Sequence, residues 1–289
     1  MKSPALRSLT VLALAVTTLT LTTGAIPLPA PLAAAPARAT TTYAFADEFT
    51  GTAGSLPSSR WSFQTGGNGW GNGELQQYTA RATNAHLDGA GHLAVVVRRE
   101  TYTGSDGITR YFTSARLFTS APVSYGYAEA RILLPSGKGL WPAFWSLGAN
   151  ITSVGWPLCG EIDTLESINS MTSASGTIHG ADTVKNVAYK YGVGTTPAGG
   201  LAGTWHTYAV SKTSSSFSWY LDGVKYGTVN RSSFTTGQQW PFDQSQYLLL
   251  NVAVGGTWPG APDSTLLDGS TMLVDWVHAG AGLPPDATS

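Results

Sequence analysis

Short runs of apolar or alternating residues recur along the chain from about residue 40 onward, separated by clusters of Gly, Pro and Ser. Alternation with a period of two is typical of strands, and no stretch keeps the 3.6-residue apolar period of a capped helix. Many short strands without intervening helices favour two packed antiparallel sheets. We therefore predict an all-β sandwich of two antiparallel sheets, with one concave face and little helix. The clearest predicted strands span residues 92–98, 127–134, 175–179, 247–254 and 272–277.

A tight hairpin is predicted where two short runs, residues 219–221 and 224–226, flank the dipeptide Asp222-Gly223. Asp-Gly suits the two central positions of a type I′ turn, because both positions need a positive φ. This is the strongest local turn signal in the chain.

The first 39 residues have the features of a secretory signal peptide. Lys2 and Arg7 precede an apolar run over residues 9–21, and an Ala/Pro-rich stretch ends in Ala37-Arg38-Ala39. A membrane anchor is the alternative, but the run is short for a span and contains several Thr. We expect export and cleavage near Ala39, which leaves residues 40–289 as one secreted domain without a membrane segment.

Composition narrows the function classes further. Only 11% of the residues are charged and the net charge is −1, so the chain has no basic footprint for nucleic acid or an anionic membrane. The surface must instead be built from Gly, Ser, Thr and the aromatic residues, of which 10 are Trp. A single cysteine, Cys159, forbids an intrachain disulfide, and we expect it to be a small buried hydrophobe. We expect a monomer with one apolar core.

Three acidic residues stand alone in the middle of the chain. Glu161, Asp163 and Glu166 are the only acids between Ala130 and Ala181, and they lie on one apolar, strand-like segment. Strict alternation would turn Glu166 to the other face, but a β-bulge near Thr164-Leu165 would return it. Three carboxyls on one face repel one another, so their pKa values separate. That separation provides the ionised nucleophile and the protonated acid of a retaining glycosidase.

Two plainer interpretations of these acids are available. The carboxylates could be the solvated face of a strand, or they could bind calcium, although the spacing lacks the glycine turn of an EF-hand loop. The neighbouring residues favour a sugar site instead, because indoles stack on the apolar faces of pyranose rings. Trp141, Trp145 and Trp156 precede the acidic segment, and His179 lies on the next predicted strand.

The segment Glu-Ile-Asp-Thr-Leu-Glu, residues 161–166, resembles the bulged E-x-D-x-x-E motif of glycoside hydrolase family 16. The resemblance continues over nearly all of residues 40–289 and is closest to the family's bacterial laminarinases. It implies a β-jelly-roll with the catalytic strand on the floor of an open cleft, and endo-β-1,3-glucanase activity on laminarin-type β-glucan. Further blocks in the family's order are residues 47–49, 69–78, 113–116, 125–131, 139–145, 176–180, 241–244, 250–259 and 272–277.

The resemblance also implies roles for individual residues. Glu161 matches the nucleophile, Glu166 the general acid/base and Asp163 the assisting acid between them. The predicted substrate-binding residues are Asn72, Arg116, Trp141, Trp145, Trp156, His179 and Trp258. The alternative for Trp141 and Trp145, which lie in one strand-like run, is that one of them points inward and packs in the core. Catalysis requires no cofactor, but a structural Ca²⁺ is expected at the backbone carbonyls of Glu48 and Gly91 and the carboxylate of Asp275.

Several alternatives stay open from the sequence. The same fold and chemistry could act on mixed-linkage β-1,3-1,4-glucan or on a galactan, and a chain that had lost catalysis could be a β-glucan-binding protein. The retained Glu161, Asp163 and Glu166 argue against the last of these. The sequence departs from the family's pattern at two places. Gly73 stands where the family usually has a larger residue, and the last block ends Trp276-Val-His278 where the family usually has V-R-V-Y.

Overall fold

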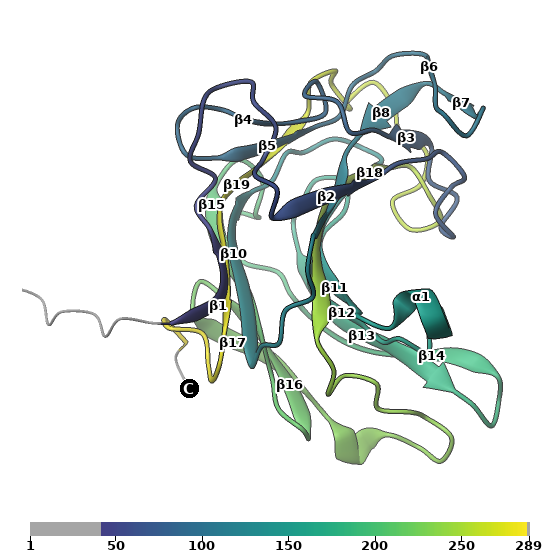
Figure 1. Cartoon of the computed structure of the whole chain (residues 1–289), viewed down its shortest axis with the longest axis vertical. Coiled ribbons are helices and arrows are strands. Elements are labelled where there is room, and N and C mark those ends of the chain that lie inside the picture. The colour runs from purple at the N-terminus through teal and green to yellow at the C-terminus, as the bar shows by residue number, and fades with distance from the viewer. Residues whose placement is uncertain (1–41, 288–289) are drawn as a thin grey trace, which may run out of the picture. The chain divides into compact units, whose positions relative to one another are not determined.

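The computed structural model describes residues 42–287, which form two large antiparallel sheets (Figure 1). The predicted all-β sandwich is therefore confirmed. The predicted signal peptide, residues 1–39, lies outside the described residues. Within residues 42–287 no helix is both long enough and apolar enough to cross a bilayer. Helix is limited there to the short α1 (Ile151–Val154) and the 3₁₀ turn η1 (Arg231–Ser233).

The larger sheet has eight strands, in the order β17-β16-β15-β10-β19-β5-β4, with β1 also paired to β19. Every pairing in it is antiparallel. Its strands are β1 (Tyr43–Asp47), β4 (Ala85–Leu87), β5 (Leu93–Val96), β10 (Tyr127–Leu133), β15 (Trp205–Lys212), β16 (Ser216–Leu221), β17 (Val224–Asn230) and β19 (Thr271–Gly280).

The second sheet has seven strands, in the order β14-β13-β12-β11-β18-β9-β2, and it carries the three acids. Strand β12, which spans Glu161–Glu166, lies between β11 and β13 near the middle of the sheet. The other strands are β2 (Trp61–Gln64), β9 (Arg116–Thr119), β11 (Leu140–Gly148), β13 (Ala174–Asp182), β14 (Val187–Thr195) and β18 (Gln246–Val254). Two small sheets complete the fold, β3 (Gln76–Tyr78) with β8 (Phe112–Ser114) and β6 (Tyr102–Thr103) with β7 (Thr109–Arg110).

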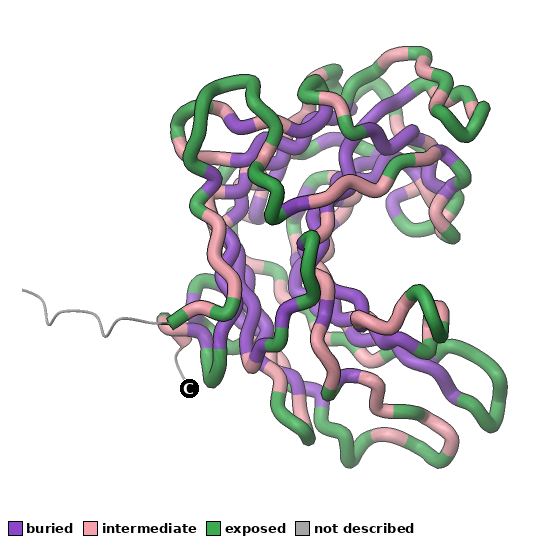
Figure 2. The backbone as a smooth tube through the Cα atoms, in the orientation of Figure 1, coloured by how far each residue is buried: buried purple, intermediate pink, exposed green. Residues whose placement is uncertain are grey.

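A single large apolar core joins the two sheets. Ile132 and Val277 of the larger sheet belong to the same buried cluster as Phe144, Ile162 and Leu250 of the second sheet, and Figure 2 shows buried segments on the strands of both sheets. One hydrogen bond also crosses between the sheets: the indole N–H of Trp219 on β16 donates to the backbone carbonyl of Asp163 on β12 at 2.8 Å. The core thus fixes the strand that carries the acids from behind.

The predicted hairpin is confirmed between β16 and β17. Asp222 has a φ of 51° and Gly223 a φ of 78°, as a type I′ turn requires. The other predicted strands are present with shifted ends. For example, β13 and β19 extend beyond the predicted runs, whereas β5 is shorter than the predicted 92–98.

Candidate active site

The three acids project from one face of β12 because the strand contains a bulge. Asp163 pairs with Thr177 of β13 and Glu166 pairs with Ser175, so three steps along β12 match two along its partner. Ile162 and Leu165 are fully buried in the core, which turns residues 161, 163 and 166 to the opposite face. The bulge predicted near Thr164-Leu165 is confirmed, and it aims Glu166 to the side of Glu161 and Asp163.

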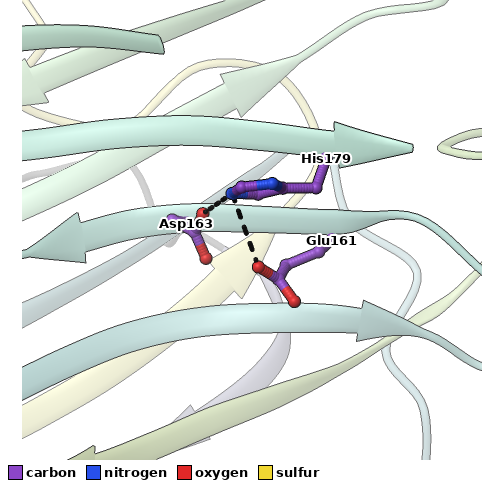
Figure 3. Close-up of side chains that lie close together, drawn as sticks. All are labelled: Glu161, Asp163 and His179. Carbon is purple, nitrogen blue, oxygen red and sulfur yellow. Dashed lines mark ion pairs between the residues drawn. The ribbon is translucent and has the colours of Figure 1, made fainter. Parts of the chain in front are cut away.

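Each carboxyl has a defined partner on that face. The indole N–H of Trp156 donates to Oε2 of Glu161 at 3.1 Å, and the indole N–H of Trp141 donates to Oε1 of Glu166 at 2.9 Å. His179 on β13 pairs with Glu161 in the sheet register. Its Nε2 lies 3.3 Å from Oδ2 of Asp163 and 3.6 Å from Oε1 of Glu161 (Figure 3).

Burial raises the pKa of all three carboxyls, and the charge of a neighbouring carboxylate adds to the rise at Glu161 and Asp163. Burial, followed by the charge of Asp163, raises the pKa of Glu161 to about 8. Burial and the charge of Glu166 raise the pKa of Asp163 well above its ordinary value. Burial also raises the pKa of Glu166, against the opposing effect of the Trp141 hydrogen bond. Interacting carboxyls with raised pKa values lose their protons in separate steps, so the face can offer an ionised and a protonated carboxyl together.

Trp141 and Trp145 both lie on the same face as the acids, so the alternative that one of them points inward is excluded. They are four residues apart on β11, and an even spacing on a strand keeps both side chains on one face. Trp145 pairs with Asp163 in the register, and its indole N–H donates to Oδ1 of Asn251 at 2.7 Å. Trp141 meets the ring of Trp258 edge to face at 5.4 Å.

Two of the predicted substrate-binding indoles are open to solvent. Trp156 is 51% exposed and Trp258 is 44% exposed, even though both contact groups of the site. Large aromatic surfaces beside hydrogen-bonded carboxylates suit the stacking of a pyranose ring. The exposure of both indoles is compatible with their predicted role in substrate binding.

Arg116 is held inside the protein surface rather than displayed on it. Its guanidinium lies between the rings of Trp70 and Trp145, 4.6 and 4.5 Å from their centroids, and its Nε donates to Gln64 at 2.6 Å. The residue is 9% exposed. Arg116 therefore fixes the plane of Trp145 by a cation–π sandwich and offers little surface to a ligand.

A buried carboxylate that the sequence analysis did not assign supports Asn72. Glu74 is 4% exposed, and its two carboxylate oxygens accept hydrogen bonds from Asn72 at 3.2 Å and from Gln76 at 2.7 Å. Tyr78 also hydrogen-bonds Glu74, and its hydroxyl accepts from Asn251 at 3.1 Å. Because Asn251 also accepts a hydrogen bond from the indole of Trp145, a continuous network of hydrogen bonds joins Asn72 to the indole beside the acids.

The residues of this hydrogen-bonded network lie in sequence blocks that match the family. Trp70, Glu74 and Tyr78 belong to the block 69–78, and Asn251 belongs to the block 250–259. The blocks identify these residues as part of a pattern, but only the structure shows which of them hydrogen-bond one another.

The prediction that Cys159 is a small buried hydrophobe is confirmed. It is fully buried, and burial followed by the charge of Glu161 raises the pKa of its thiol to about 11. A thiol with such a pKa is not a nucleophile at neutral pH.

The predicted calcium residues are brought near one stretch of β19. Strand β5 pairs with β19 up to Val274, and β1 pairs with it from Val277 onward, so residues 275–276 face the chain around Gly91 and Glu48. The carboxylate of Asp275, however, already accepts a hydrogen bond from Arg131 at 2.5 Å and lies 3.9 Å from Nε2 of His92. The Arg131–Asp275 pair competes with binding of a metal ion by Asp275. Calcium binding at this site stays a prediction.

Comparisons with known proteins agree with this geometry. The family described as "Glycosyl hydrolases family 16" matches residues 72–278. A "Beta-glucanase" of Rhodothermus marinus is 39% identical over 230 residues, which cover 75% of this chain and 76% of the relative. The endo-β-1,3-glucanase structure from Pyrococcus furiosus is 38% identical with a TM-score of 0.72, over 81% of this chain and 92% of that one. A LamA variant from Z. galactanivorans, solved with laminaritriose and laminaritetraose, is 33% identical with a TM-score of 0.72, over 82% and 98%.

Proposed function

Because this chain belongs to glycosyl hydrolases family 16 and is a glycoside hydrolase, we propose that it is a secreted, retaining endo-β-1,3-glucanase acting on laminarin-type β-glucans. The observation that carries the proposal is the bulge in β12, which gathers Glu161, Asp163 and Glu166 on one face. The names of the R. marinus and P. furiosus relatives support a β-glucan substrate, as do the oligosaccharides in the LamA complex.

The proposed mechanism is a double displacement. Ionised Glu161 attacks the anomeric carbon while Glu166 donates its proton to the leaving glycosidic oxygen, which gives a covalent glycosyl-enzyme. Glu166 then takes a proton from water as the water attacks the same carbon, and Glu161 is released. The Trp156 hydrogen bond orients the attacking carboxylate, and the Trp141 hydrogen bond holds the acid. Asp163, beside both, sets how the protons are shared.

The substrate is tested by reducing-end release from laminarin, barley mixed-linkage glucan and agarose, with a size profile of the products. Fast release of short oligosaccharides from laminarin is expected. Cleavage of barley glucan would measure how strictly the enzyme requires β-1,3 linkages. Activity on agarose alone would overturn the substrate. Tight laminarin binding without hydrolysis would overturn the enzymatic proposal in favour of a binding protein.

The residue roles are tested by two isosteric variants. Glu161→Gln and Glu166→Gln are each expected to lower kcat on laminarin by about 10²–10⁴-fold or more, because each removes a group that reacts or transfers a proton. Proton NMR of the first product formed by the wild type should show the β-anomer, as retention demands. An initial α-anomer, or near wild-type turnover in either variant, would contradict the assignment.

We also propose that residues 1–39 direct export, that the secreted enzyme is a monomer, and that it carries a structural Ca²⁺. Oxygen donors from separate segments suit Ca²⁺, but binding would require the Arg131–Asp275 pair to loosen. Protein recovered from the medium should begin near Thr40 and elute as a single chain. Added Ca²⁺ should raise the thermal midpoint (Tm) of the wild type and not that of Asp275→Asn. An equal rise in both would rule out Asp275 as a ligand.

A further inference from the structure

One histidine and two carboxylates converge on the face of β12. His179 on β13 lies directly opposite Glu161 in the register, and Asp163 is the next outward residue of β12. One donor atom from each of the three side chains lies within 4.8 Å of the other two. Among residues 42–287 this is the one group of three His, Cys, Asp or Glu side chains arranged in this way. In Figure 3 one ring nitrogen of His179 faces both carboxylates.

The two distances from His179 to the carboxylate oxygens fit a small divalent ion. Bonds of about 2.0–2.2 Å from Zn²⁺ to nitrogen and oxygen place two ligands of a tetrahedral site about 3.4 Å apart. Nε2 of His179 lies 3.3 Å from Oδ2 of Asp163 and 3.6 Å from Oε1 of Glu161. Neither contact meets hydrogen-bond geometry, so the imidazole already stands at ligand–ligand distance from both oxygens.

A second observation concerns Asp163 alone. Its Oδ2 is fully buried and receives no hydrogen bond in the structure, although it is the oxygen turned toward His179. A buried, unsatisfied carboxylate oxygen is costly, and a cation beside it would remove that cost. The other oxygen of Glu161 accepts from Trp156, as the second oxygen of a metal-binding carboxylate commonly does.

We propose that Glu161, Asp163 and His179 form a binding site for a divalent transition-metal ion such as Zn²⁺, and that the bound ion inhibits the enzyme by occupying the nucleophile. The inhibitory consequence rests on the proposed function, whereas the binding site itself does not. The imidazole selects ions of the zinc class over Ca²⁺ and Mg²⁺, which prefer oxygen ligands. The side chains of Glu161 and His179 are 18% and 21% exposed, so an ion can enter from solvent.

Binding is tested with Zn²⁺ by titration calorimetry and with Co²⁺ by its visible absorption, on the mature protein without substrate. We expect one site, weakened at least tenfold in His179→Ala. The matched control is His206→Ala, because His206 also contacts a carboxylate, Asp222 at 2.7 Å, on the other sheet. This control should bind as tightly as the wild type. Glu161→Gln should also bind more weakly, which tests the site even if His179→Ala does not fold.

Inhibition is then measured on laminarin. Zn²⁺ should raise KM without lowering kcat, and EDTA should restore activity. The His206→Ala enzyme should show the same inhibition. Binding that neither His179→Ala nor Glu161→Gln weakens would overturn the proposed site. Inhibition that lowers kcat alone would overturn the competition with substrate. A wild type that binds Co²⁺ through His179 but hydrolyses no glucan would preserve the site and overturn the proposed function instead.

Discussion

Asp163 is the most buried of the three acids, and its charge raises the pKa of Glu161. It is 2% exposed, and its backbone carbonyl is fixed by the indole of Trp219 from the opposite sheet. The charge of Asp163 is the second cause, after burial, of the raised pKa of Glu161. Asp163 can therefore set the pH at which Glu161, the proposed nucleophile, becomes ionised.

This dependence predicts the pH profile of Asp163→Asn. Removing the negative charge lowers the pKa of Glu161, so ionised Glu161 persists to lower pH. The acid limb of kcat/KM on laminarin should shift toward lower pH, and kcat should fall because the shared proton is lost. The measurement is a pH–rate series for both enzymes. An acid limb that moves to higher pH would contradict the assigned influence of Asp163.

At the scale of single residues, the sequence predicts chemistry better than orientation. The isolation of Glu161, Asp163 and Glu166 in an apolar stretch was enough to predict both the cluster and its bulge, because only a bulge puts all three on one face. The roles of the surrounding groups were harder to predict. The charge of Arg116 suggests that the side chain binds a ligand, but its guanidinium packs against the rings of Trp70 and Trp145.

At the scale of the element, the segment of residues 69–78 is held together by hydrogen bonds to one buried side chain. The carboxylate of Glu74 hydrogen-bonds the side chains of Asn72, Gln76 and Tyr78. Gln76 in turn accepts the backbone N–H of Val254 at 2.7 Å, which attaches the loop to β18. Asn72 therefore keeps its position only while Glu74 can accept several donors.

Glu74→Gln should consequently disturb the loop more than the acids. One of its acceptor oxygens becomes an N–H₂ that faces donors, which costs about 1–3 kcal/mol. We expect a lower Tm and a KM for laminarin raised several-fold, with a smaller change in kcat. The matched control is Glu100→Gln, whose carboxylate is partly exposed and pairs with Arg81. That variant should lose less than about 1 kcal/mol. Equal effects in the two variants would contradict the role of Glu74.

Elements defined by local chemistry could be predicted, and those defined by distant partners could not. The Asp222-Gly223 hairpin needs only two adjacent residues with positive φ. The chain from Trp145 through Asn251 to Tyr78 joins residues separated by 106 and 173 positions. Periodicity carries no information on such pairs, and the sequence blocks name the residues without their contacts.

At the scale of the whole molecule, the candidate active site lies in the middle of a sheet whose other face packs on the core. Strands β13, β12, β11 and β18 are neighbours in this sheet, and no local sequence pattern predicts their order. Fully buried Ile162 and Leu165 hold the bulged strand from behind. The same packing that positions the acids deprives them of water, so the molecule must carry their raised pKa values as a cost to its stability.

This cost predicts that the wild type is less stable than Glu161→Gln at alkaline pH. The folded-state pKa of Glu161 is about 8, whereas a glutamate in an unfolded chain titrates near 4.3, as in peptides. Between those values the folded state binds the extra proton, so the stability from this group is present below about pH 4.3 and is lost as the pH rises through 8. Gln does not titrate and loses nothing over that range.

The expected gain for Glu161→Gln is roughly 1–2 kcal/mol at pH 8, or a Tm higher by a few degrees, shrinking toward zero near pH 5. Thermal unfolding at several pH values measures it. Glu100→Gln is the control of opposite sign, because Arg81 lowers the pKa of Glu100 and its loss should slightly destabilise the protein at neutral pH. If Glu161→Gln were no more stable than the wild type at pH 8, Glu161 would not be held at the expense of the fold, and its raised pKa would itself be contradicted, because a raised folded-state pKa costs stability whatever its cause.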